Sequence, residues 1–179
     1  MLNDAVFNGI FKMNYASILR CDVANGPGFR VSLFVSGCSR KCPGCFNEIA
    51  QDPSYGKKFD SQAKEKIFKE LSKEYCSGLS LLGGEPMSKL SNNREAVIEL
   101  CKETKEKFPE KNIWMWSGYT FEELISDPTS KNIFNYIDVL VDGPFIESEK
   151  DLDLAWKGSR NQRVIDVKKT TESGNIVVF

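Results

Sequence analysis

The chain has 179 residues, of which 41% are hydrophobic and 27% are charged, and its formal net charge is −1. These values are ordinary for one globular domain, and the balanced charge argues against a broad nucleic-acid surface, which would carry a basic excess. No apolar run approaches the ~20 residues of a membrane span, and the first residues carry an acid without a basic cluster. We therefore expect no membrane contact, no secretory signal and a cytoplasmic protein.

The sequence contains six cysteines and no histidine. The absence of histidine excludes Ser-His-Asp and Cys-His catalytic pairs, histidine-ligated zinc and the commonest general base near neutral pH. Chemistry must therefore come from cysteines, carboxylates, lysines or a bound cofactor. Because three cysteines are spaced as in metal sites, reduced thiols in the cytosol fit better than a disulfide framework.

The first predicted elements lead toward that cysteine cluster. Residues 1–12 are weakly patterned, and we expect them to form a variable arm. Residues 15–20 partly alternate between polar and apolar side chains, which predicts a strand. The sequence Asn-Gly-Pro-Gly at 25–28 predicts a tight turn that returns the chain into a second, buried strand over 29–35.

The cysteine loop follows this strand directly, with the sequence F-V-S-G-C-S-R-K-C-P-G-C-F-N at 34–47. Its cysteines, Cys38, Cys42 and Cys45, have the spacing C-x3-C-x2-C. Clustered thiolates select zinc, copper(I) or iron–sulfur clusters. A [4Fe-4S] cluster usually takes four cysteines, so a loop that offers three leaves one iron open to a substrate.

Two other interpretations of the loop remain open at this point. Structural zinc normally has four Cys or His ligands, but the chain has one C-x2-C and no histidine, and Cys21 lies beyond a predicted turn. The sequence Cys42-Pro43-Gly44-Cys45 is also similar to a dithiol redox motif. That interpretation leaves Cys38 unused and requires a helix where Pro43 and Gly44 predict a loop.

Strands and helices alternate after the loop. We expect helices at 61–75 (capped by Asp60 or Ser61), 92–108, from about 121 (capped by Thr120) and 131–136. We expect strands at 79–82, 112–116, 138–141 and 164–169, a solvated acidic loop at 147–153, and a terminal hairpin in which a turn at 172–175 leads to 176–179. No linker divides the chain, so we expect one domain over 1–179, with 168–179 as the hairpin extension.

Polar and glycine-rich segments follow three of these strands, at 83–86 (Gly-Gly-Glu-Pro), 117–118 (Ser-Gly) and 142–143 (Asp-Gly). Paired glycines allow a ligand to approach the backbone, and we expect their N–H groups to point into the opening. Alternating strands and helices predict an α/β fold with a mainly parallel sheet, and the chain is too short for the ~250 residues of a closed eight-unit barrel. We expect an open, partial (β/α) barrel whose strand ends, with the cysteine loop, meet at one rim.

The cysteine spacing resembles the signature of radical S-adenosylmethionine (SAM) enzymes. The fuller pattern F-V-S-G-C-x3-C-P-G-C-F-N resembles the activating proteins of anaerobic ribonucleoside-triphosphate reductases. The resemblance extends over about 13–165 and includes V-D-G-x-F at 141–145 and W-x-G-S-x-N-Q at 156–162. Many radical SAM enzymes have an aromatic residue before the third cysteine. This chain has Gly44 there and Phe46 after it, as in the activating proteins.

The resemblance implies a [4Fe-4S] cluster on the three cysteines and SAM bound at its fourth iron. It implies reductive cleavage of SAM and formation of a glycyl radical on the large reductase subunit, with an external one-electron donor, flavodoxin-like or similar, and no nucleic acid. The residues expected near the cofactors are Gly44, Cys45, Phe46, Gly83, Gly84, Glu85, Ser117 and Asp142. Glu85 or a backbone carbonyl would accept hydrogen bonds from the SAM ammonium, and Arg160 or Arg163 could meet its carboxylate or only the protein surface.

Two further hypotheses remain. The chain could be a radical SAM enzyme that acts on another glycyl-radical enzyme or on a small molecule. Outside this class, it could be a zinc or dithiol C-x-x-C protein, which metal analysis would distinguish because thiolate-bound iron–sulfur clusters absorb near ~400 nm.

Overall fold

The computed structural model describes residues 12–90 and 92–179. The expected N-terminal arm therefore lies outside these residues except for Lys12. Within the described chain no helix is long and apolar enough to cross a membrane.

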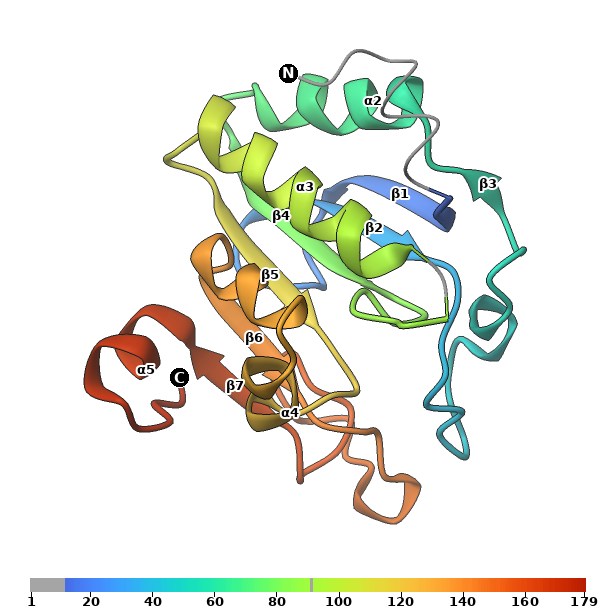
Figure 1. Cartoon of the computed structure of the whole chain (residues 1–179), viewed down its shortest axis with the longest axis vertical. Coiled ribbons are helices and arrows are strands. Elements are labelled where there is room, and N and C mark those ends of the chain that lie inside the picture. Colours follow the sequence, from blue (N-terminus) through green and yellow to red (C-terminus); the bar gives the residue numbers. More distant parts are fainter. Residues whose placement is uncertain (1–11, 91) are drawn as a thin grey trace.

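One seven-stranded sheet runs through the molecule in the order β3-β1-β2-β4-β5-β6-β7 (Figure 1). The strands are β1 (Asn14–Asp22), β2 (Phe29–Val35), β3 (Lys57–Lys58), β4 (Cys76–Gly83), β5 (Asn112–Trp116), β6 (Val139–Asp142) and β7 (Arg163–Asp166). Strands β2, β4, β5 and β6 are parallel, and β1, β3 and β7 are antiparallel to their neighbours. The expected α/β class with a mainly parallel centre is confirmed, and the sheet is open.

Three helices lie between successive parallel strands: α2 (Ser61–Leu71), α3 (Asn93–Lys107) and α4 (Phe121–Ser126). A fourth helix, α5 (Val167–Ser173), follows β7, and 3-10 turns occur at η1 (Glu48–Gln51), η2 (Ser130–Asn135) and η3 (Glu147–Glu149). The Asp60 side chain caps α2, as expected, by accepting the Ala63 N–H at 2.9 Å. Thr120 and Glu123 form a reciprocal capping box at the start of α4, which satisfies two otherwise free N–H groups.

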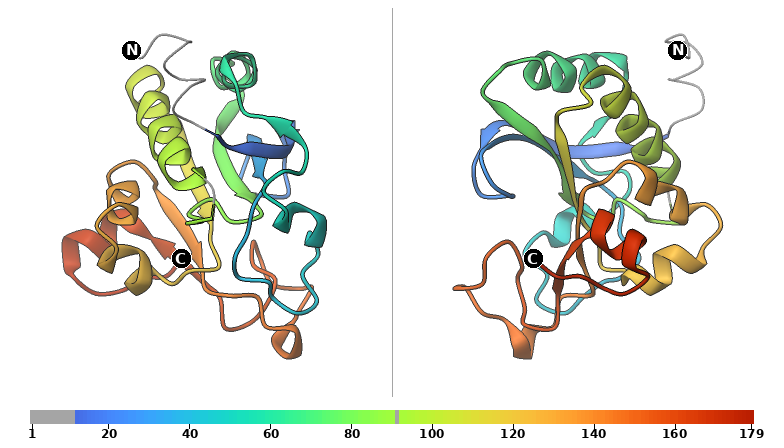
Figure 2. Two further views of the ribbon diagram at one scale, coloured as in Figure 1. Left: turned by 45° about the vertical axis from the view of Figure 1, so that its right-hand side comes forward. Right: turned by 90° about the vertical axis from the view of Figure 1, so that its left-hand side faces the viewer.

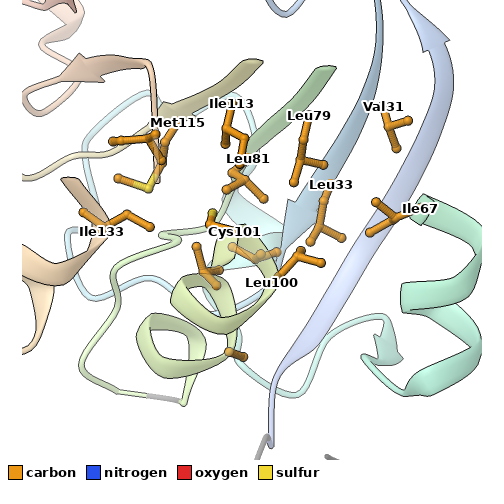
Figure 3. Packing of buried hydrophobic residues seen from close by; sticks show 14 of the residues in the cluster. Val31, Leu33, Ile67, Leu79, Leu81, Leu100, Cys101, Ile113, Met115 and Ile133 are labelled. Carbon is orange, nitrogen blue, oxygen red and sulfur yellow. The ribbon is translucent and has the colours of Figure 1, made fainter. Parts of the chain in front are cut away.

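The main hydrophobic core lies between α2, α3 and one face of the sheet (Figure 3). Alternate residues of each strand point into it, as the two-residue period of a strand requires. Its fully buried members include Leu33, Leu81 and Ile113 from the strands and Ile67 and Leu100 from the helices. These helices are therefore held on one face of the sheet, and the strands turn their remaining side chains toward the opposite face.

The C-terminal segment differs from the expected hairpin. Residues 167–173 form helix α5 because the Asp166 side chain accepts the Lys169 N–H at its start and Gly174 ends it with a φ of 71°. The chain then returns antiparallel to β7 through a single bridge between Ile165 and Val178. A helical connection thus replaces the turn predicted at 172–175.

Candidate functional site

The carboxyl ends of the parallel strands surround a cavity of about 390 Å³ on the face of the sheet away from α2 and α3. Figures 1 and 2 show the cysteine loop and the segment after β6 gathered at this end of the molecule. The expected residues that line the cavity are Cys38, Cys42, Gly44, Cys45, Phe46, Gly83, Gly84, Glu85 and Ser117. Segments far apart in sequence therefore meet at one rim, as parallel strand ends predict.

Three free thiols belong to this cavity. Cys38, Cys42 and Cys45 are half-buried, and burial raises the pKa of the Cys38 thiol, whose sulfur accepts the Arg40 N–H at 3.4 Å. The loop turns tightly between them: Lys41 has a φ of 46°, and the Cys45 N–H donates to the Cys42 carbonyl at 3.2 Å. These turns direct three cysteines from one short segment toward the same space.

Backbone hydrogen bonds hold the base of the cysteine loop. The Gly37 N–H donates to the Ala50 carbonyl at 2.7 Å, the Gly84 N–H to the Val35 carbonyl at 2.7 Å, and the Glu85 N–H to the Gly37 carbonyl at 2.9 Å. The expectation that the N–H groups of the paired glycines point into the opening is therefore wrong for Gly84, and the Glu85 N–H is also bonded within the protein. Because glycine has no side chain, the ends of β2 and β4 can lie close together here. A Cβ on Gly84 would lie only 2.7 Å from the Ala50 oxygen.

Glu85 connects the ends of β4 and β5. Its carboxylate, 1% exposed, accepts hydrogen bonds from the Met87 and Gly118 N–H groups at 2.9 and 2.7 Å and from the Ser117 hydroxyl at 2.8 Å. Burial raises the pKa of this carboxyl group, and these donors oppose that rise. Within the described chain, oxygen Oε2 accepts only the Gly118 bond, so it retains capacity for a donor from the cavity.

Asp142 is the one expected site residue that does not line the cavity. Its carboxylate is 1% exposed, accepts the Phe121 N–H at 2.7 Å and forms an ion pair with Arg163. Arg163 also pairs with Glu122, and Arg160 pairs with Asp151. Asp142 therefore stabilises the strand ends from outside the cavity. Both arginines are paired with carboxylates of the protein.

The cavity also includes residues that were not among the expected cofactor contacts, although some belong to the motifs at 117–118, 141–145 and 156–162. They are Arg40, Gln51, Leu82, Trp116, Gly118, Gly143, Phe145, Lys150, Leu152, Gly158 and Gln162. The loop expected to be merely solvated supplies two of them, Lys150 and Leu152, and its Glu147 carboxylate lies against Gly44. Alternation along the strands could have indicated Leu82 and Trp116, but only folding brings residues 150–152 beside the cysteine loop.

The three cysteines can be compared with the ligands that a single metal ion requires and with those that an iron–sulfur cluster requires. Among residues 12–90 and 92–179, no three His, Cys, Asp or Glu side chains gather closely enough to hold a single ion. Thiolates around one zinc ion lie within about 4 Å of one another, whereas each thiolate of a cluster binds a different iron. The cavity offers three free cysteines and the chain has no histidine, which is one ligand short of a closed structural zinc shell and leaves one iron of a [4Fe-4S] cluster without a protein ligand.

Cys21 does not belong to this donor set. It lies at the far end of β1, where Asp22 pairs with Arg30 at the beginning of β2, while the cysteine loop follows the end of β2. Its exposed sulfur contacts Glu70 and Tyr75. The fourth ligand considered for zinc is therefore the length of a strand away from the other three cysteines.

Comparison with known proteins places the chain in a family. A model described as a 4Fe-4S single cluster domain matches residues 24–165. The chain is 43% identical over 152 residues to an anaerobic ribonucleoside-triphosphate reductase-activating protein of Vibrio cholerae, covering 84% of this chain and 96% of that protein. It is 42% identical over 154 residues to the protein of the same name from Enterobacteria phage T4, covering 85% and 93%, and 37% identical to that of Escherichia coli K12, covering 85% and 97%. The chain therefore belongs to the family of anaerobic ribonucleoside-triphosphate reductase-activating proteins, with a 4Fe-4S single cluster domain.

Proposed function

We propose that this protein is a radical SAM activase that generates the glycyl radical of an anaerobic ribonucleoside-triphosphate reductase. The observation that carries the proposal is the meeting of Cys38, Cys42 and Cys45 with the Gly83–Glu85 strand end around one cavity. The loop offers three thiolates to a cluster of four irons, so one coordination position stays available to a substrate. The open sheet is, on this proposal, the partial barrel of a single radical SAM domain.

The cysteines would hold the cluster, which when bound supplies one electron for the cleavage of SAM to methionine and a 5′-deoxyadenosyl radical. Glu85 Oε2, which borders the cavity, would accept a hydrogen bond from the SAM ammonium. The cations that line the cavity are Lys150 and Arg40, the latter also paired with the exposed Glu123 at 3.3 Å. Because Arg160 and Arg163 do not line the cavity, Lys150 and Arg40 are better candidates for the SAM carboxylate. We do not assign a SAM contact to Asp142, because its oxygens are already paired.

Apolar side chains complete the cavity and would limit the access of water to a reactive radical. Trp116 forms one wall, and its indole N–H donates to the Trp156 carbonyl at 2.6 Å, which ties the wall to the segment after β6. Phe145 and Leu152 come from that segment, and Phe46 comes from the cysteine loop. Leu152 and Phe46 are 88% and 85% exposed, so the mouth presents apolar groups to a partner, here the large reductase subunit.

Anaerobic reconstitution of cysteine variants tests the proposal. We expect Cys38→Ala, Cys42→Ala and Cys45→Ala each to lower the bound iron and to reduce the reductive cleavage of SAM by at least about 100-fold. The matched control is Cys21→Ala, which removes an exposed thiol outside the cavity and should keep parental iron and cleavage. A loop variant that cleaves SAM at the parental rate would contradict the ligand assignment.

Electron paramagnetic resonance of the reduced protein, with and without SAM, provides a second test. A change of the cluster spectrum on addition of SAM is expected, because SAM would complete the coordination of the fourth iron. Stoichiometric zinc after anaerobic purification would overturn the proposal.

The electron donor is proposed to be a separate protein in the same reducing compartment, the cytoplasm, since the described cysteines are all unpaired.

A further inference from the structure

A second groove lies away from the cysteine site, between strand β1 and helix α2. A cavity of about 740 Å³ lies between β1 and α2, and it shares no lining residue with the cysteine cavity. Figures 1 and 2 show α2 alongside β1, at the end of the molecule away from the cysteine loop. A second cavity lined by 18–21, 70, 73 and 75 continues it along β1.

The groove is strongly basic although the chain has a net charge of −1. Its walls contain five cations against one carboxylate, namely Arg20, Lys57, Lys66, Lys69 and Lys73 against Glu70. Glu70 is buried and already paired with Lys73 at 2.8 Å. The other four cations are exposed, and no acidic side chain of the described chain forms an ion pair with them. Four uncompensated charges at one place create a local field that favours an acidic ligand.

The floor of the groove is a sheet edge. On the side away from β2, strand β1 pairs only with β3, and only through Asn14 and Tyr15. No described strand pairs with the remaining residues of β1 on that side. Free backbone N–H and C=O groups at a strand edge are a template for another strand.

Exposed apolar side chains border the far end of the groove, beside Arg20, Glu70 and Lys73. Leu19 and Tyr75 are 44% and 48% exposed there, and both line the continuing cavity. A free phosphate or a nucleic-acid backbone would make no use of such side chains or of an open strand edge. A protein segment with acidic side chains and an apolar end would use the charges, the edge and the apolar contacts together.

We propose that the β1–α2 groove docks an extended, acidic segment of a partner protein, which adds to the edge of β1 as an extra strand. Lys66 and Lys69, one helical turn apart on α2, contact its carboxylates from one side, and Arg20 and Lys57 do so from the strands. Because the groove and the cysteine cavity share no residues, the docked segment leaves the cavity open.

Binding of labelled peptides to the full-length protein tests this proposal. The probe is a ~12-residue peptide of alternating glutamate and valine, followed by fluorescence anisotropy at low and high salt. We expect the Lys66→Glu/Lys69→Glu variant to bind it at least about tenfold more weakly, since both reversals oppose the acidic probe. The matched control is Lys102→Glu/Lys131→Glu, which makes the same charge change at exposed lysines outside the groove and should bind within about twofold of the parent.

A glutamate–proline peptide of equal charge separates strand addition from simple charge attraction, because proline cannot donate to a sheet edge. We expect it to bind at least about tenfold more weakly. The proposal is overturned if the two double variants lose affinity equally, if the proline peptide binds as well, or if a single-stranded oligonucleotide of equal charge binds more tightly. It is also overturned if binding requires deletion of residues 1–11, since that segment would then be the occupant.

Discussion

The two ends of one face of the sheet have opposite character. Toward the amino ends of the parallel strands, Arg30 is fully buried, and its guanidinium donates to Ser80 Oγ at 2.7 Å and Asn112 Oδ1 at 2.6 Å and to three backbone carbonyls. Toward the carboxyl ends lies the cavity with three free thiols. The polar groups of the first end are buried and bonded to one another, whereas those of the second, Glu85 among them, are bonded within the protein and also border an open cavity.

Two tryptophans on β5 show the same contrast. Trp114 is 2% exposed and packs near Arg30, Trp156 and Phe179. Trp116, two residues later on the same face, lines the cavity. The same residue type on the same strand therefore closes one end and borders the opening at the other. The position of a ligand site is decided by strand direction rather than by residue type.

Removing the Arg30 hydrogen bonds at the amino ends of the strands should have the largest effect on stability. Arg30→Met preserves much of the volume but leaves buried acceptors such as the Leu79 carbonyl without this donor, and we expect a loss of about 3 kcal/mol in the free energy of unfolding. Burial lowers the pKa of Arg30 to about 10, so the side chain is still charged at neutral pH. Urea denaturation measures the loss. Arg20→Met, an exposed control, should stay within about 0.5 kcal/mol of the parent, and equal stability of the two variants would refute the role of Arg30.

Gly84→Ala tests the attachment of the cysteine loop. The added Cβ would lie 2.7 and 2.8 Å from the Ala50 and Gly37 carbonyl oxygens, which are backbone atoms that cannot rotate away. We expect a loss of about 2 kcal/mol and a lower iron content after reconstitution. In the control Gly118→Ala, the new Cβ meets the flexible Arg40 side chain at 3.0 Å, so the loss should be smaller. The reverse order of the two losses would contradict this account of the loop.

Arg163→Ala tests whether Asp142 supports the rim or contacts a ligand. Removal of the guanidinium leaves the buried Asp142 carboxylate with the Phe121 N–H alone, and we expect a loss of about 2 kcal/mol. Adding Asp142→Asn should recover part of the loss, because the unpaired charge is then removed. The affinity of the folded protein for SAM, measured by calorimetry, should change little. A large drop in affinity with unchanged stability would assign Asp142 to the ligand instead.

Trp116→Phe should have the smallest effect of the series. It removes the indole donor to the Trp156 carbonyl but keeps an aromatic wall, and we expect a loss of about 1 kcal/mol. Thermal unfolding can detect this difference. An unchanged melting temperature would mean that the hydrogen bond contributes nothing to holding the segment after β6.

Local patterns were sufficient for much of the fold. Strands β2 and β5 have the predicted limits, and the caps of α2 and α4 were identified from Asp60 and Thr120, because these features depend on residues close in sequence. Helix α2 ends at Leu71 rather than at 75, and β4 begins at Cys76 rather than at 79. The C-terminal helix was missed because the turn signal at 172–175 was interpreted as the bend of a hairpin, although Asp166 and Gly174 are the residues that cap the helix.

The sequence by itself determined the order of the elements, the spacing of the three cysteines and the family. Only the tertiary structure decided which polar groups remain available for a ligand. Asp142 is paired with Arg163, and the Gly84 and Glu85 N–H groups are used by the ends of β2, whereas Arg40 and Lys150 reach the cavity. Each of these outcomes depends on a partner distant in sequence. A hydrogen bond or ion pair between such partners forms only when the sheet brings them together, and no local pattern records it.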